Sequence, residues 1–301
     1  MTILKRTLVT FLILAVAASL AFAAGQQAEG GEEKGSVELA YVEWARSVAI
    51  THLAGEILSE MGWDVRLSNV ANAAMWQSVA AGDSDALLAA WLPATHQMFY
   101  GDEGEFTDDV VDLGPNYEGA KLGLVVPEYV EEDSISDLVE NGDKYDWEIV
   151  GIDPGAGMMQ QTEEAIENDD YGLGEFELLE GSDSTMAAAL QDAIRNEEPV
   201  VVTGWQPHWK FGRWDLKILE DPERVFGESE TINTMVRKGL EEDDPELFTF
   251  FDEMDWFSVE EGIGQIMVDV EEGMDPEEAA AAYVEDNQDA INDALPDGMS
   301  L

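Results

Sequence analysis

The 301-residue chain contains no cysteine, so neither a disulfide framework nor a thiol nucleophile is available to it. Basic residues are also scarce, because 14 lysines and arginines stand against 66 aspartates and glutamates, a formal net charge of −52. Nucleic-acid phosphates would meet this negative field, which argues against a nucleic-acid partner. The acids are spread along the chain, and we interpret them as an adaptation to a saline habitat, since ~1 M salt shortens the screening length to about 3 Å.

Signatures of catalysis and metal binding are missing as well. The sequence has no G-x-S-x-G nucleophile elbow, no H-E-x-x-H zinc motif and no glycine-lysine P-loop. The three histidines, His52, His96 and His208, lie in different segments without the spacing of metal ligands. We therefore expect a protein that is not an enzyme and that needs no metal and no cofactor.

One apolar run stands out at the N-terminus, where it follows Lys5 and Arg6 and closes on Ala21-Phe22-Ala23. This order predicts a secretory signal peptide over residues 1–23, followed by a flexible leader over residues 24–36. A membrane anchor is the alternative, but the run is short for a span of about 20 residues. We expect export across the inner membrane to a soluble periplasmic or extracytoplasmic protein, since no cysteine is present to carry a lipid anchor.

From residue 37 onward, short apolar runs typical of strands alternate with segments of helical periodicity. This alternation predicts an α/β fold with largely parallel sheets, in two units over about 37–121 and 122–218. The last third is expected to be helical. In it, Asp244-Pro245 and Asp275-Pro276 each place a capping carboxylate before a proline suited to the first helical position.

Three of the nine tryptophans share one position relative to the predicted strands. Trp44 follows the first strand, Trp91 ends the third, and Trp205 ends a strand of the second unit in the stretch VVTGWQPHW. Ligands of open α/β sheets collect at the carboxyl ends of strands, so these rings could converge across a cleft. Core packing explains any one of them as well, and it is their shared position that favours a binding site.

A glycine-containing turn, Asp153-Pro154-Gly155-Ala156-Gly157, precedes a predicted helix that starts near Met158. The unpaired amides and the dipole of such a helix start attract anions, although an ordinary turn has the same sequence pattern. Tryptophan faces attract cations that cannot donate hydrogen bonds, of which quaternary ammonium is the leading example. Together, the two features predict a small zwitterionic ligand.

The motifs AYVEW, AAWLPATH, DLGPNYEGAKLGLVVP, GIDPGAGMM and VVTGWQPHWKF resemble those of the glycine betaine-binding proteins of osmoprotectant ABC importers, nearly continuously from about residue 37 to 292. The resemblance implies a two-lobed periplasmic-binding-protein fold of type II, in which each lobe is a mostly parallel sheet flanked by helices and the ligand lies between the lobes. It implies one lobe from residues 37–121 and 219–301 and another from residues 122–218.

The resemblance also implies the roles of individual residues. Trp44, Trp91 and Trp205 match the family's aromatic cage for the quaternary ammonium group. Gly157 and Met158 match its carboxylate-binding amides, and His96 matches a histidine near that carboxylate. The implied protein is a monomer that delivers glycine betaine to an ABC permease for osmoprotection.

Two alternatives stay open at this point. The same fold could serve another solute, such as proline betaine, choline, carnitine or ectoine. More distantly, an acidic sugar-binding module or hydrolase would also use tryptophans, because these rings stack on sugars.

Overall fold

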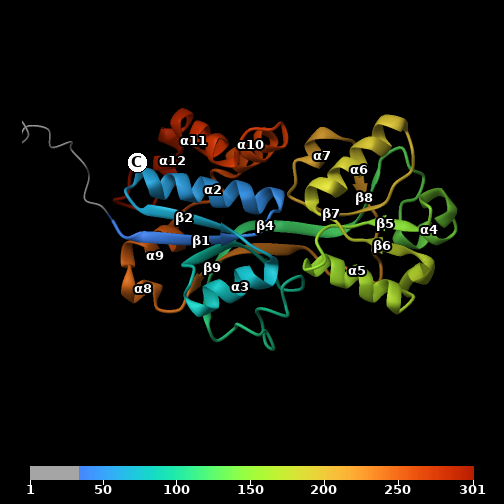
Figure 1. Ribbon diagram of the computed structural model, residues 1–301, viewed down its shortest axis with the longest axis horizontal. Helices are drawn as coiled ribbons and strands as arrows, with labels where there is room; N and C mark the ends of the chain where they lie inside the picture. Colours follow the sequence, from blue (N-terminus) through green and yellow to red (C-terminus); the bar gives the residue numbers. More distant parts are fainter. Residues whose placement is uncertain (1–33) are drawn as a thin grey trace, which may run out of the picture. The chain divides into compact units, whose positions relative to one another are not determined.

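Within residues 34–301, which the computed structural model describes, nine strands form one sheet (Figure 1). The predicted signal peptide and all but the end of the predicted leader lie outside the described residues. That leader was expected to reach residue 36, but Ser36 already belongs to the first strand. No helix within the described part of the chain is long and apolar enough to cross a membrane.

The strands run in the order β2-β1-β3-β9-β4-β7-β5-β6 across the sheet, and β8 pairs with β4 beside this path. Their bounds are β1 (Ser36–Tyr41), β2 (Asp64–Asn69), β3 (Ala86–Leu92), β4 (Val110–Pro127), β5 (Glu148–Val150), β6 (Glu177–Leu179), β7 (Val202–Gln206), β8 (Leu216–Ile218) and β9 (Glu230–Arg237).

Helices cover both faces of the sheet (Figure 1). They are α2 (Ala45–Glu60), α3 (Asn72–Ala81), α4 (Ile135–Val139), α5 (Gly157–Glu167), α6 (Asp183–Asn196), α7 (Lys210–Arg213), α8 (Leu240–Asp243), α9 (Pro245–Glu253), α10 (Glu260–Glu271), α11 (Pro276–Asp286) and α12 (Gln288–Ala294), with 3₁₀ turns η1 (Gly142–Tyr145) and η2 (Asp170–Glu175). The predicted caps are confirmed, because the Asp244 carboxylate accepts from the backbone N–H of Leu247 and that of Asp275 from Glu277.

The long strand β4 changes partners along its length. Val110–Ala120 pairs with β9, whereas Lys121–Val125 pairs with β7. We call β2, β1, β3, β9 and the first part of β4 the first sheet half, and the rest of β4 with β7, β5, β6 and β8 the second sheet half. The change of partner lies next to the predicted boundary between residues 121 and 122.

The predicted α/β fold is confirmed, and the pairing of neighbouring strands is mixed. The pairs β1/β2, β1/β3, β5/β6 and β5/β7 are parallel, but β3/β9, β4/β9, β4/β7 and β4/β8 are antiparallel. Parallel neighbours here are joined by the crossover helices that periodicity reveals. Strand β9 instead returns from the second sheet half and inserts between β3 and β4, inside the third of the chain that was expected to be helical.

The hydrophobic core of the first sheet half surrounds α2, whose apolar residues Ile50, Leu53 and Ile57 are fully buried. Helices α10 and α11 pack against α2 on one face, while α3 covers the other face (Figure 1). In the second sheet half, α6 and α7 lie on one side and α5 on the other (Figure 1). The C-terminal helices therefore complete the first sheet half.

Candidate functional site

The three tryptophans selected from the sequence line one hollow. Trp44 caps the start of α2 just past β1, Trp91 is the next-to-last residue of β3, and Trp205 lies near the end of β7. Their exposed fractions are 7%, 6% and 4%. The other lining residues are Thr95, Leu122, Ile152, Ala156, Gly157 and Met158, and about 260 Å³ between them is free of protein atoms and partly open to solvent. No lining side chain carries a charge.

The start of α5 forms another wall of the hollow. Gly157 and Met158 are its first two residues, and Ala156 before them has extended backbone. The first amides of a helix have no acceptor inside the helix, so they are free to bind an anion. Gly157 also approaches the first sheet half closely, because a Cβ built on it would lie 2.2 Å from the carbonyl oxygen of Thr95. A side chain at position 157 is therefore incompatible with this arrangement.

A buried carboxylate holds the loop after β3 in place. Glu230, 2% exposed at the start of β9, accepts hydrogen bonds from the backbone amides of Ala94 (2.6 Å) and Thr95 (2.8 Å) and from Thr95 Oγ1 (2.6 Å). Bonds to an ionised acceptor are stronger than neutral ones. These three hydrogen bonds therefore hold the loop that carries the Thr95 carbonyl in its position opposite Gly157.

His96 differs from the other candidates, because it is fully buried and does not line the hollow. Its ring stacks on Trp44 with the centroids 5.9 Å apart. The backbone N–H of Trp91 donates to His96 Nδ1 at 3.0 Å, so the neutral ring carries its proton on Nε2. Burial lowers the pKa of His96 to about 3. His96 therefore supports Trp44 as a neutral ring, and its predicted contact with a carboxylate stays a prediction.

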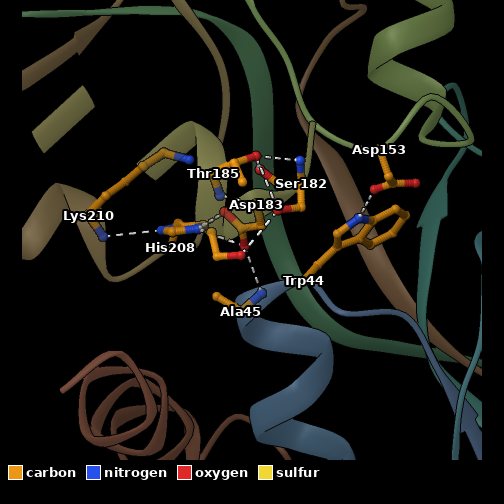
Figure 2. A network of polar contacts seen from close by, with 9 residues as sticks. Trp44, Ala45, Asp153, Ser182, Asp183, Thr185, His208 and Lys210 are labelled. Carbon is orange, nitrogen blue, oxygen red and sulfur yellow. Dashed lines mark hydrogen bonds and ion pairs between the residues drawn. The ribbon is translucent and has the colours of Figure 1, made fainter. Parts of the chain in front are cut away.

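Two carboxylates of the second sheet half reach across to consecutive residues of the first (Figure 2). Trp44 Nε1 donates to Asp153 Oδ2 at 2.8 Å, and the backbone N–H of Ala45 donates to Asp183 Oδ2 at 3.0 Å. Sequence reasoning missed both acceptors. Among 66 acidic residues, pairing cannot be predicted from the sequence.

Behind Asp183 lies a buried polar cluster with His208 and Lys210 (Figure 2). His208 Nε2 donates to Asp183 Oδ1 at 3.0 Å, and His208 Nδ1 accepts from the backbone N–H of Lys210 at 3.1 Å. Burial lowers the pKa of His208 to about 4, despite the opposing effect of Asp183. Burial by itself would raise the pKa of Asp183, but His208, Lys210 and the Ala45 amide favour the carboxylate and lower it.

Lys210 is an unusual residue in this cluster. Its side chain is fully buried, and its Nζ lies 4.1 Å from the centroid of the Trp205 ring. Burial lowers the pKa of Lys210 to about 8, with Asp183 acting in the opposite direction. Lys210 directly follows the VVTGWQPHW stretch, so its position in the sequence was visible. Its contact with the Trp205 ring could be found only in the folded structure. Among residues 34–301, no group of three or more acidic or histidine side chains is arranged to hold a metal ion.

Comparison with known proteins gives a family match over most of the chain. Residues 35–286 match the family described as the substrate binding domain of ABC-type glycine betaine transport system. The glycine betaine/carnitine transport binding protein GbuC of Listeria monocytogenes is 42% identical over 152 residues, which cover 50% of this chain and 49% of that protein. The chain thus aligns with about half the length of this relative.

Solved structures resemble the chain over a greater length. Lactococcal OpuAC in its closed-liganded conformation complexed with glycine betaine is 38% identical, with a TM-score of 0.79, and the match covers 87% of this chain and 100% of that one. The glycine/betaine/L-proline-binding protein ProX from Borrelia burgdorferi is 35% identical, with a TM-score of 0.81 and coverage of 88% and 97%. These similarities confirm the predicted periplasmic substrate-binding fold. The relatives are transport proteins, not enzymes.

Proposed function

Because the chain belongs to the family of substrate-binding domains of ABC-type glycine betaine transport systems, we propose that it captures glycine betaine and delivers it to an ABC permease. The observation that carries this proposal is the hollow itself, in which three indole rings meet the start of α5. The rings supply a site for a cation and the helix start supplies a site for an anion.

In the proposed complex, Trp44, Trp91 and Trp205 cage the trimethylammonium group. Their π faces attract a cation, and each contact contributes about 0.5–2 kcal/mol. A quaternary ammonium has no N–H group that would need an acceptor, so it suits walls without charged side chains. A primary ammonium would lose its hydrogen bonds to water in the same place, which explains selection for methylated amines.

The carboxylate of the ligand accepts hydrogen bonds from the amides of Gly157 and Met158. The dipole of α5 favours negative charge at this end, and backbone donors suit a chain with few basic residues. The hollow is small, which matches a solute with few non-hydrogen atoms.

Capture requires the two sheet halves to come together, because Trp44 and Trp91 belong to the first and Trp205 and Gly157 to the second. We take them as the two lobes, residues 37–121 with 219–301 and residues 122–218, which close on the ligand about the crossings in β4 and after β8. The bonds from Trp44 to Asp153 and from Ala45 to Asp183 then hold the closed state. The protein acts as an exported monomer.

Calorimetric titration with glycine betaine in ~2 M NaCl tests this function. We expect micromolar or tighter binding that Trp91→Ala weakens by about 30-fold or more, since one cation–π contact and its apolar burial are lost. Trp147→Ala is the matched control, because this ring packs on Phe176 away from the hollow. Equal affinities of the native protein and Trp91→Ala would contradict the cage.

A panel of other solutes separates the rival ligands. Proline betaine, carnitine and ectoine test the size of the hollow, while choline tests the amide site, because choline has no carboxylate. Choline bound more tightly than glycine betaine would contradict the role of Gly157 and Met158. Stabilisation by sugars and not by any methylated amine would contradict the proposed class of ligand.

A further inference from the structure

Lys210 is a buried cation that contacts a wall of the hollow. Its Nζ is 4.1 Å from the centroid of Trp205 and has no hydrogen-bond partner among the residues that the structure describes. The side chain runs past Gly204, where a Cβ would lie 3.4 Å from Lys210 Cε. Only 14 basic residues occur in the whole chain, so an ammonium placed here is not explained by abundance.

Trp205 lines the hollow together with the other two tryptophans, and Lys210 does not. We propose that the charge of Lys210, held against Trp205 and outside the hollow, opposes binding of a quaternary ammonium ion to the same ring from within the hollow, so that capture of the ligand is coupled to loss of a proton from Lys210. This inference rests on the proposed function.

The physical reason is that one ring cannot serve two cations independently. Both ions draw on the same π electrons, and they would stand roughly 8 Å apart in a site screened little by salt, so their repulsion weakens binding on the order of tenfold. A neutral amine at position 210 removes this repulsion. By linkage, a bound ligand favours the neutral amine in turn.

The groups around Lys210 confine the effect to one pH window. Asp183 on α6 attracts the ammonium, and His208 in the preceding turn lies beside both residues. Glu271 on α10 contacts Arg213 rather than Lys210. With the pKa of His208 at about 4 and that of Asp183 lowered, only Lys210 of this cluster, with a pKa of about 8, changes charge between pH 6.5 and 9.5. Affinity should therefore rise with pH in that interval.

Titration with glycine betaine at pH 6.5 and 9.5, at fixed salt, tests the coupling. We expect the native protein to bind about tenfold more tightly at pH 9.5 and to release protons at pH 8, seen as heats that differ between buffers of different ionisation enthalpy. Lys210→Met keeps the length of the side chain without its charge, and it should bind tightly at both pH values without proton release. Lys210→Arg keeps a cation at both values and should bind weakly at both.

Lys238→Met is the matched control, because it removes one positive charge from a lysine that donates to the Asp108 carbonyl in the first sheet half. It should keep the native pH dependence. If the native protein binds glycine betaine equally tightly at both pH values, the inference is wrong but the proposed function stands. The same holds if Lys210→Met keeps the native increase of affinity with pH. If neither the native protein nor any variant binds glycine betaine at either pH, the proposed function is wrong, and so is the inference that rests on it.

Discussion

The substitution Gly157→Ala tests whether the closed arrangement creates the site. A Cβ at this position would lie 2.2 Å from the Thr95 carbonyl oxygen, 2.8 Å from Thr95 Cγ2 and 3.0 Å from the Thr95 carbonyl carbon. Ordinary contact begins near 3.4 Å, so the two backbones must separate by about 1 Å. Thr95 cannot retreat cheaply, because three hydrogen bonds tie its loop to Glu230.

We therefore expect the start of α5 to move away from the hollow. Each hydrogen bond between the ligand carboxylate and an amide contributes about 1.5–3 kcal/mol, and a gap of about 1 Å also forfeits up to half of each close dispersion contact. A loss of about 3 kcal/mol or more corresponds to binding weakened at least about 100-fold. The free protein should keep its stability within about 1 kcal/mol, because opening the two sheet halves relieves the clash.

Calorimetry with glycine betaine measures this loss, and thermal unfolding without ligand checks the fold. Gly155→Ala is the matched control in the same turn, since a Cβ there would meet only Asp153 Oδ1 at 3.6 Å, an ordinary contact. It should bind within about threefold of the native protein. Native-like affinity in Gly157→Ala would refute the reasoning, because the closed arrangement would then not be needed for binding.

Two further predictions concern polar groups around the hollow. Asp153→Ala should weaken binding about threefold to 30-fold, because Trp44 loses the acceptor of its indole N–H. Most of this loss should appear as faster ligand dissociation, which stopped flow measures. Asp143→Ala is the control, since it removes the acceptor of another indole, that of Trp147. An unchanged dissociation rate in Asp153→Ala would contradict that role. Acid should destabilise the protein, because the pKa of His96 is about 3 and that of His208 about 4, whereas the unfolded chain binds both protons near pH 6.5. The free energy of unfolding should fall by about 1 kcal/mol per pH unit for each histidine below pH 6.5, and equal values from urea titrations at pH 7 and 5 would contradict this.

Much of the candidate site could be predicted from sequence because strand ends are visible there. An apolar run that stops at Gly204-Trp205 marks the end of β7, and similar runs place Trp44 and Trp91. Parallel strands bring such ends to one edge, so residues far apart in the chain could be assigned to one place. A glycine turn before a helical pattern indicated Gly157 in the same way, whereas Met158 was implied by the family resemblance.

The polar partners could not be predicted, because their pairing depends on closure of the fold. Nothing in the sequence distinguishes the three acceptors, Asp153, Asp183 and Glu230, from the many other acids in the chain. Only the folded backbone places each of them next to a hydrogen-bond donor. The sequence motif identified His96 but could not show how deeply it is buried. In the structure its ring stacks on Trp44 and does not line the hollow. The contact between Lys210 and Trp205 depends on how the chain turns after β7.

The sequence by itself determined the α/β class, the strand ends that carry the tryptophans and the helix start that can hold an anion, since each of these is a local pattern of apolar periodicity, turn residues and caps. Tertiary structure alone decided that β9 inserts antiparallel between β3 and β4, that Gly157 touches Thr95, and that the Lys210 ammonium lies against Trp205. The reason is physical: local patterns follow from the energetics of neighbouring residues, whereas pairing of distant segments depends on packing that the whole chain must satisfy at once.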